Sequence, residues 1–225
     1  MTEHKQLNWF QGLLILGIIW LAGAIGDRIW FVLDHSVPAW DQADYLNGVL
    51  NYWKALQTPQ WFDGEWWRNL WLLSPKIPPL TYILTVPWVN IFGTSPDAAT
   101  LIMLPLSAIL LLSVYSLGAE LFNVSVGLWA AVLCQLLPGL YYYRLEFLLD
   151  YPLTTFVTLS FCLLTLWKFK GNHKTLNRES GVGNRESELI SSPSSLSSLS
   201  PPSPHPLPWL RVIAFGLSLG LALMV

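Results

Sequence analysis

Charged side chains are scarce in this chain of 225 residues: Lys, Arg, Asp and Glu make up 12%, against 53% hydrophobic residues. The net charge is −2, and no basic patch with interleaved aromatic residues occurs, so nucleic acid is not an expected partner. Only two cysteines are present, Cys134 and Cys162, and both lie inside apolar segments. A thiol in such a segment behaves as a small hydrophobic group. The sequence therefore predicts neither a disulfide nor a thiolate metal site.

Other signatures of common active sites are also missing. The four histidines are scattered, and none lies at metal-ligand spacing from another histidine or from a cysteine. No Gly-rich phosphate-binding loop and no Ser-His-Asp arrangement can be found. These absences give no support to a histidine metal centre, a phosphate loop or a serine nucleophile.

Long apolar segments are abundant instead, and they recur at residues 13–25, 80–92, 101–117, 126–137, 151–167 and 209–225. A helix needs about 20 mostly apolar residues to cross a bilayer. The sequence therefore predicts an all-α, multi-pass integral membrane protein. We expect residues 9–33 to be an uncleaved anchor, because their apolar character continues beyond the small residues that loosely resemble a signal-peptide cleavage site.

Positive charge marks the cytoplasmic side of a membrane protein. Lys5 precedes the first apolar segment, and five basic residues lie between positions 168 and 185, so both regions are predicted to be cytoplasmic. An even number of crossings must then separate them, although the interval contains five apolar segments. The segment at 77–92 is short and contains three prolines, so we expect it not to cross.

The crossings are then predicted at residues 9–33, 98–117, 126–143 and 151–167. This topology places Asp41 and Asp150 together on the extracytoplasmic side. Residues 34–95 become a long first loop with juxtamembrane helices: one at 44–57 and a tryptophan-rich interfacial segment at 61–71. The apolar face of the first of these helices is predicted to comprise Tyr45, Val49, Tyr52, Trp53 and Leu56.

The composition changes sharply after the fourth predicted crossing. Residues 1–170 form the predicted transmembrane module. Residues 171–208 are rich in Ser and Pro and repeat the sequence Asn-Arg-Glu-Ser, a composition that cannot bury enough apolar area to fold. We expect them to be a disordered cytoplasmic insert. Residues 209–225 start a further span that ends without a polar flank, and we expect the chain to be truncated there.

Ionisable residues at the edges of the apolar segments are the candidates for chemistry, because a charge beside hydrocarbon is costly. On the predicted outer face these are Asp41, Asp44, Asp63, Glu65, Arg68, Lys76, Arg144, Glu146 and Asp150. A partly desolvated carboxylate can act as a general base, and Lys or Arg can hold a phosphate. This set favours a protein that handles a lipid-linked phosphate. Asp150 has a second, compatible interpretation as a helix N-cap.

Four short motifs occur in one order along the chain. They are Asp-Gln-Ala-Asp-Tyr at 41–45, Ser-Pro-Lys-Ile-Pro-Pro-Leu at 74–80, Ile-Phe-Gly-Thr-Ser at 91–95 and Leu-Leu-Asp-Tyr-Pro-Leu at 148–153. Together they resemble the N-terminal part of the C-type (GT-C) glycosyltransferases. The nearest branch resembles bacterial relatives of protein O-mannosyltransferases and aminoarabinose transferases. The resemblance implies a GT-C-like helical bundle in the bacterial plasma membrane, with a cytoplasmic N-terminus and an extracytoplasmic active site.

The resemblance also implies a reaction and its residues. The donor would be a polyprenyl-phosphate sugar, the acceptor a lipid, glycan or protein, and a divalent cation is the one cofactor left open. Asp41 and Asp150 match the catalytic acids of the outer face. Lys76 matches a lysine near the donor phosphate, and Asp44 a second acid of the first motif. Arg144 and Glu146, which come from the charged residues of the predicted outer face and not from the motifs, complete the predicted substrate-binding set.

The chain departs from the family pattern at three positions. Ile77 is inserted between Lys76 and the prolines, Thr100 replaces an arginine that is frequent in relatives, and Glu120 stands where a basic residue is common. The second hypothesis, favoured by the expected truncation, is a catalytically inactive membrane scaffold that binds lipid or a partner. A transporter is a third interpretation, but inverted repeats and polar residues in the middle of the spans are not evident.

Overall fold

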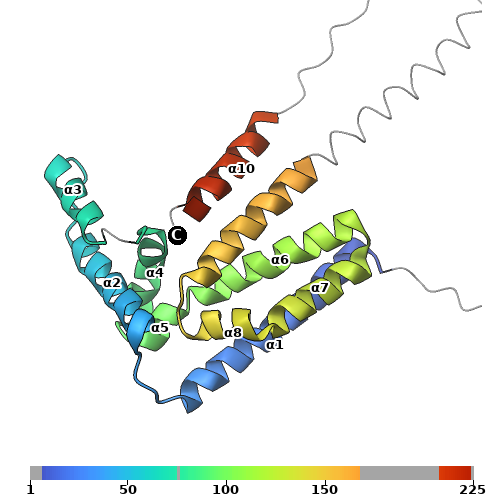
Figure 1. Ribbon diagram of the computed structural model, residues 1–225, viewed down its shortest axis with the longest axis horizontal. Coiled ribbons are helices and arrows are strands. Elements are labelled where there is room, and N and C mark those ends of the chain that lie inside the picture. The colour runs from blue at the N-terminus through green and yellow to red at the C-terminus, as the bar shows by residue number, and fades with distance from the viewer. Residues whose placement is uncertain (1–6, 75–76, 168–207, 224–225) are drawn as a thin grey trace, which may run out of the picture.

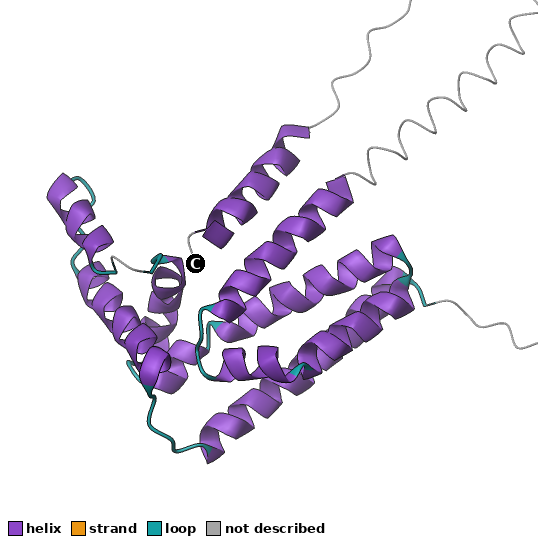
Figure 2. Cartoon of the chain, viewed as in Figure 1, coloured by secondary structure: helices purple, strands orange, loops and turns teal. Residues whose placement is uncertain are grey.

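The computed structural model describes residues 7–74, 77–167 and 208–223, and the regular structure within them is helical throughout (Figures 1 and 2). The all-α prediction is therefore confirmed. The labelled helices are α1 (Trp9–Leu33), α2 (Trp40–Gln57), α3 (Gly64–Leu72), α4 (Leu80–Phe92), α5 (Pro96–Thr100), α6 (Met103–Leu121), α7 (Val124–Leu136), α8 (Pro138–Leu145) and α10 (Pro208–Leu223). A further helix over residues 150–167, drawn in orange between α6 and α10, is named here the 150–167 helix.

Two helical segments among the described residues are long and apolar enough to cross a membrane, namely α1 and the stretch Pro96–Leu121 that includes α6. The pair α7 and α8 makes a third if the two count as one broken span. With 25 residues, α1 is about 37 Å long, more than the hydrocarbon core of a bilayer. Most of its apolar side chains are exposed, as expected for a helix that faces lipid. These helices are compatible with the predicted integral membrane protein.

The segment that we expected not to cross contains α4. This apolar helix has 13 residues, which gives a length of about 20 Å, shorter than the hydrocarbon core. Pro79 precedes it, and Pro87 lies inside it. Six of its side chains are buried, and it packs beside α2.

The predicted crossing at 126–143 is made of two helices rather than one. The helix breaks at Leu137, and α7 and α8 are bent relative to each other by 56°. Leu137 is extended, with φ −64° and ψ 116°. The ring of Pro138 clashes with a helical backbone at the preceding residue and favours this extended geometry. Proline also suits the first turn of the new helix, where its missing N–H costs nothing.

Three helices form the centre of the bundle: α1, α6 and α7 lie against one another (Figure 1). The start of α1 and the turn between α6 and α7 lie at one end, where the Tyr115 hydroxyl donates to the Trp9 carbonyl at 3.0 Å. The end of α1, the end of α8 and the start of the 150–167 helix gather at the other end. We call this second end, made of residues 34–42 and 142–150, the rim.

A second group of helices lies beyond the rim, where α2, α3 and α4 run across the direction of α6 (Figure 1). The predicted helix at 44–57 is confirmed within α2, which begins four residues earlier. Its apolar face is largely as predicted: Val49 and Tyr52 are buried, and Tyr45, Trp53 and Leu56 are partly buried against the same core. The predicted interfacial segment overlaps α3, which exposes Trp67 and Trp71.

The remaining domain predictions are only partly covered by the structure. Residues 168–207 lie outside the described residues, and with them nearly all of the predicted disordered insert. The predicted span that begins at residue 209 coincides with α10, which starts one residue earlier. The Ser160 hydroxyl donates to the Ser218 hydroxyl at 3.0 Å and joins the 150–167 helix to α10.

Two glycines allow the close approach of α6 and α7. A Cβ at Gly118 would lie 2.6 Å from the Gly127 Cα, which is backbone and cannot move aside. We expect Gly118→Ala to lower the free energy of unfolding by about 1–3 kcal/mol, because the helices must separate. Gly17→Ala is the matched control, since nothing lies within 4 Å of its Cβ position, and it should stabilise the helix by up to about 1 kcal/mol. Equal denaturant midpoints for the two variants would contradict the assignment.

Candidate functional site

A polar pocket lies at the rim, between the link from α1 to α2 and the end of α8. Its volume is about 220 Å³, and we call it the rim pocket. Its lining comprises Ser36, Val37, Ala39, Trp40, Asp41, Gln42, Tyr142, Glu146 and Leu148. Two predicted site residues, Asp41 and Glu146, therefore line one pocket although they are far apart in the sequence.

The first wall of the pocket is shaped by a capped turn after α1. Asp34 follows the helix, and its carboxylate accepts hydrogen bonds from the Ser36 amide and the Ser36 hydroxyl, each at 3.0 Å. These two bonds, the amide bond first, lower the pKa of Asp34. The chain then runs extended to the start of α2, so that Asp41 lies in the first turn of that helix.

Strained backbone flanks both predicted acids of the pocket. Trp40 and Phe147 each have φ +52°, in the left-handed region that L-residues rarely adopt. Trp40 directly precedes Asp41, and Phe147 directly follows Glu146. Each such residue costs about 1–2 kcal/mol, and such residues concentrate at functional sites. The two are the only non-glycine residues with positive φ among those described, and both lie at the rim.

Tyr45 lies on α2, one helical turn after Asp41, and three carboxylates are near its hydroxyl. Burial raises the pKa of the Tyr45 hydroxyl, and the nearby charges of Asp41, Asp150 and Asp44 raise it further. Burial likewise raises the pKa of Glu146, with a smaller contribution from the charge of Asp34. The predicted acids therefore belong to one end of the bundle, and Tyr45 remains a hydrogen-bond donor among them at neutral pH.

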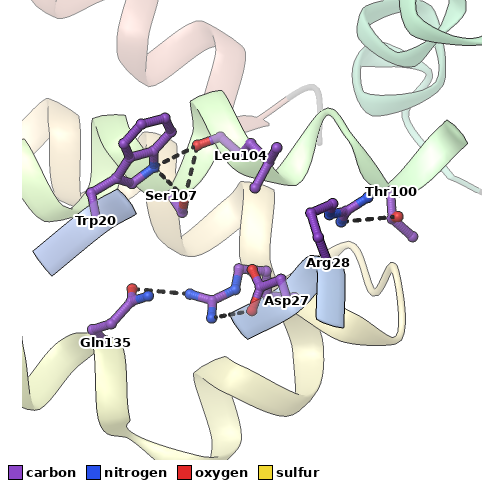
Figure 3. Close-up of polar contacts among 8 residues, drawn as sticks. Trp20, Asp27, Arg28, Thr100, Leu104, Ser107 and Gln135 are labelled. Atoms are coloured by element: carbon purple, nitrogen blue, oxygen red, sulfur yellow. Dashed lines mark hydrogen bonds and ion pairs between the residues drawn. The ribbon is translucent and has the colours of Figure 1, made fainter. Parts of the chain in front are cut away.

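Arg144 does not join these acids, although it was predicted to bind substrate with them. It is buried, and its Nη2 lies 2.8 Å from the Oδ1 of Asp27 on α1. Its Nη1 donates to the Gln135 Oε1 at 3.0 Å (Figure 3). The guanidinium also lies 5.4 Å from the centre of the Tyr141 ring. These contacts engage both terminal nitrogens within the protein.

Two other predicted site residues, Asp150 and Asp44, are not among the residues that line the rim pocket. Asp150 is exposed at the start of the 150–167 helix, and Asp44 is exposed on α2. Lys76 lies outside the described residues. No group of three or more His, Cys, Asp or Glu side chains suited to a metal ion occurs within the described ranges, so the divalent cation that the resemblance leaves open is not assigned ligands.

Among the polar residues in or near the rim pocket that were not predicted are Ser36, Asp34 and the buried Asp27. A signal existed for Asp27, because an acid inside an apolar segment requires a partner. Asp34 and Ser36 carry no motif, and their role follows only from the turn that they form.

Comparison with protein families, with curated proteins and with solved structures finds no match to this chain. The rim pocket and the sequence motifs are therefore the features that bear on function.

The strain at Trp40 can be tested because its side chain is 89% exposed and packs little. We expect Trp40→Gly to have a free energy of unfolding about 1 kcal/mol higher than Trp40→Ala, since glycine adopts positive φ without a steric cost. Denaturant titration of both variants measures the difference. A more stable alanine variant would show that this backbone is not strained.

Proposed function

We propose that this chain acts as a GT-C-type membrane glycosyltransferase, which transfers a sugar from a polyprenyl-phosphate donor to an acceptor on the extracytoplasmic side. In this topology the N-terminus is cytoplasmic and the rim faces outward. The observation that carries the proposal is the rim pocket, where Asp41 and Glu146 meet at one end of an apolar helical bundle. A donor with a long apolar tail and a polar head would reach such a site from the surrounding lipid.

The reaction needs a base for the acceptor. Asp41 takes the proton of the acceptor hydroxyl or amine while that atom forms a bond to the anomeric carbon of the sugar. The bond from this carbon to the phosphate oxygen breaks, and polyprenyl phosphate leaves with the electron pair. A single displacement of this kind inverts the anomeric configuration.

The remaining acids and the lysine have supporting roles in this proposal. Lys76 contacts the donor phosphate and stabilises the leaving group through its charge. Asp150 and Asp44 contact the acceptor. Glu146, whose pKa is raised by burial, contacts the sugar from the second wall.

Transfer of a labelled sugar tests the proposal directly. The full-length protein is reconstituted in vesicles with polyprenyl-phosphate hexoses or pentoses, and acceptor labelling is measured against protein-free vesicles. We expect labelling from the lipid-linked donors and none from nucleotide sugars. No labelling from any lipid-linked donor would reject the enzyme.

The orientation has its own test. Single cysteines in place of Asp41 and Asp150 are treated in intact cells with a reagent that does not cross the membrane. Both sites should be labelled. Labelling of only one of them, when both react after the cells are opened, would reject a shared outer site.

A membrane scaffold without turnover is the second candidate. The observation that favours it is the engagement of Arg144, one of the two cations predicted near the substrate, by Asp27 and Gln135. Such a scaffold would bind a lipid-linked sugar in the vesicle assay without transferring it. Binding with no labelled acceptor therefore distinguishes the scaffold from the enzyme.

A further inference from the structure

A buried ion pair connects α1 and α8, the helices that lead into the two walls of the rim pocket. Asp27 lies on α1 and Arg144 on α8, and each side chain is only 3% exposed. Removing two charges from water is expensive, and a buried pair contributes little net stability compared with apolar residues of similar size. A pair inside apolar helices is therefore an indication of a role other than stability.

Each residue of the ion pair lies shortly before one wall of the rim pocket in the sequence. Asp27 precedes the capped turn at Asp34, which begins the first wall, by about two helical turns. Arg144 precedes Glu146, in the second wall, by two residues. The contact between Asp27 and Arg144 thus joins the helix that leads into the first wall to the helix that leads into the second.

The second wall needs such a contact because α8 is attached through a bend. It has eight residues, follows the break at Leu137, and has only Arg144 and Leu145 as buried residues. The three tyrosines of α8, Tyr141, Tyr142 and Tyr143, are exposed. The placement of α8 therefore depends largely on what holds Arg144.

Gln135 fixes the direction of the arginine. Its side chain lies against Gly23 of α1, where any Cβ would collide with it, and its Oε1 accepts from Arg144. The guanidinium is thus held between the Asp27 carboxylate of α1 and the Gln135 amide of α7 (Figure 3). By contrast Arg28, the next residue on α1, points away from α8 and donates to the Thr100 hydroxyl at 3.4 Å.

We propose that Asp27 and Arg144 are positioning residues, whose ion pair holds the two walls of the rim pocket at the separation that transfer requires. The effect on transfer rests on the proposed function, whereas the effect on the separation of the walls does not. Neither residue touches the substrate in this proposal.

The test measures the separation of the walls in the full-length protein. Spin labels are placed at Ser36→Cys and Tyr142→Cys, one in each wall, with Cys134 and Cys162 replaced by alanine, and the distance distribution is recorded in vesicles. We expect one narrow distribution in the parent and a clearly broader one in Asp27→Asn, which removes the charge at nearly constant size. Arg144→Lys retains the charge and should keep the distribution narrow. Arg28→Gln is the matched control on the same helix and should also keep it narrow.

The rate constants of sugar transfer, expressed per folded molecule, test the proposal independently of any loss of folded protein. Per folded molecule, Asp27→Asn should lower kcat at least tenfold, with KM for the donor changed less than threefold, and Arg144→Lys should recover most of kcat. If Asp27→Asn does not fold, the apolar pair Asp27→Leu with Arg144→Met replaces it, and it should also broaden the distribution. A narrow distribution of parental width in the folded variant would overturn the proposal. If the parent transfers no sugar, only the proposed function fails, and the distance measurement still decides the role of the pair.

Discussion

Replacing Arg144 alone with methionine should lower the free energy of unfolding by about 3–5 kcal/mol. The change leaves the carboxylate of Asp27 buried in an apolar bundle without its counterion, 2.8 Å from where the guanidinium was. It also removes the donor to Gln135. Denaturant unfolding in micelles, followed by tryptophan fluorescence, measures the loss.

The double variant Asp27→Leu with Arg144→Met is the decisive comparison. Both charges are then absent, and apolar side chains of similar volume fill the space, so most of the lost stability should return. Arg68→Met is the matched control, an exposed arginine on α3 whose loss should change stability by less than about 0.5 kcal/mol. If the double variant were as unstable as Arg144→Met, the loss would come from packing rather than from an unpaired charge.

The helices were predictable because the signals for them are local. A run of apolar residues is enough to predict α1 and most of α6, and the spacing of Val49, Tyr52 and Leu56 is enough to predict the buried face of α2. The break at Leu137 was also within reach, since Pro138 disfavours a helical residue before it. It was missed because the apolar composition of 126–143 suggested one continuous span.

The contacts of the site were less predictable, because they join residues that are distant in the sequence. Asp27 and Arg144 are 117 positions apart, and no local pattern relates them. Charge parity of the predicted crossings places Asp41 and Asp150 on one side of the membrane, but it specifies neither a pocket nor its lining. The strained backbone at Trp40 and Phe147 has no signal in the residue types, since neither tryptophan nor phenylalanine favours positive φ.

The proposed enzyme makes its sharpest prediction at Asp41. We expect Asp41→Asn to lower kcat by about 10²–10⁴-fold, because the amide has nearly the same size and still forms hydrogen bonds but cannot accept the acceptor proton. KM for the lipid-linked donor should change less than about threefold, since the donor is held mainly by its apolar tail and by Lys76 in this proposal. Initial rates of sugar transfer at saturating acceptor measure both constants.

Glu120→Gln is the matched control for that experiment. It removes one exposed negative charge near the end of α6, at the opposite end of the bundle from the rim, so it should leave both constants within about twofold. A general loss of charge or of membrane insertion would affect both variants equally. Loss of kcat in Asp41→Asn alone places the base in the rim pocket, because Asp41 is the pocket's only carboxylate besides Glu146. An unchanged kcat in Asp41→Asn, with a large loss in Glu146→Gln, would move the base to the other wall of the same pocket.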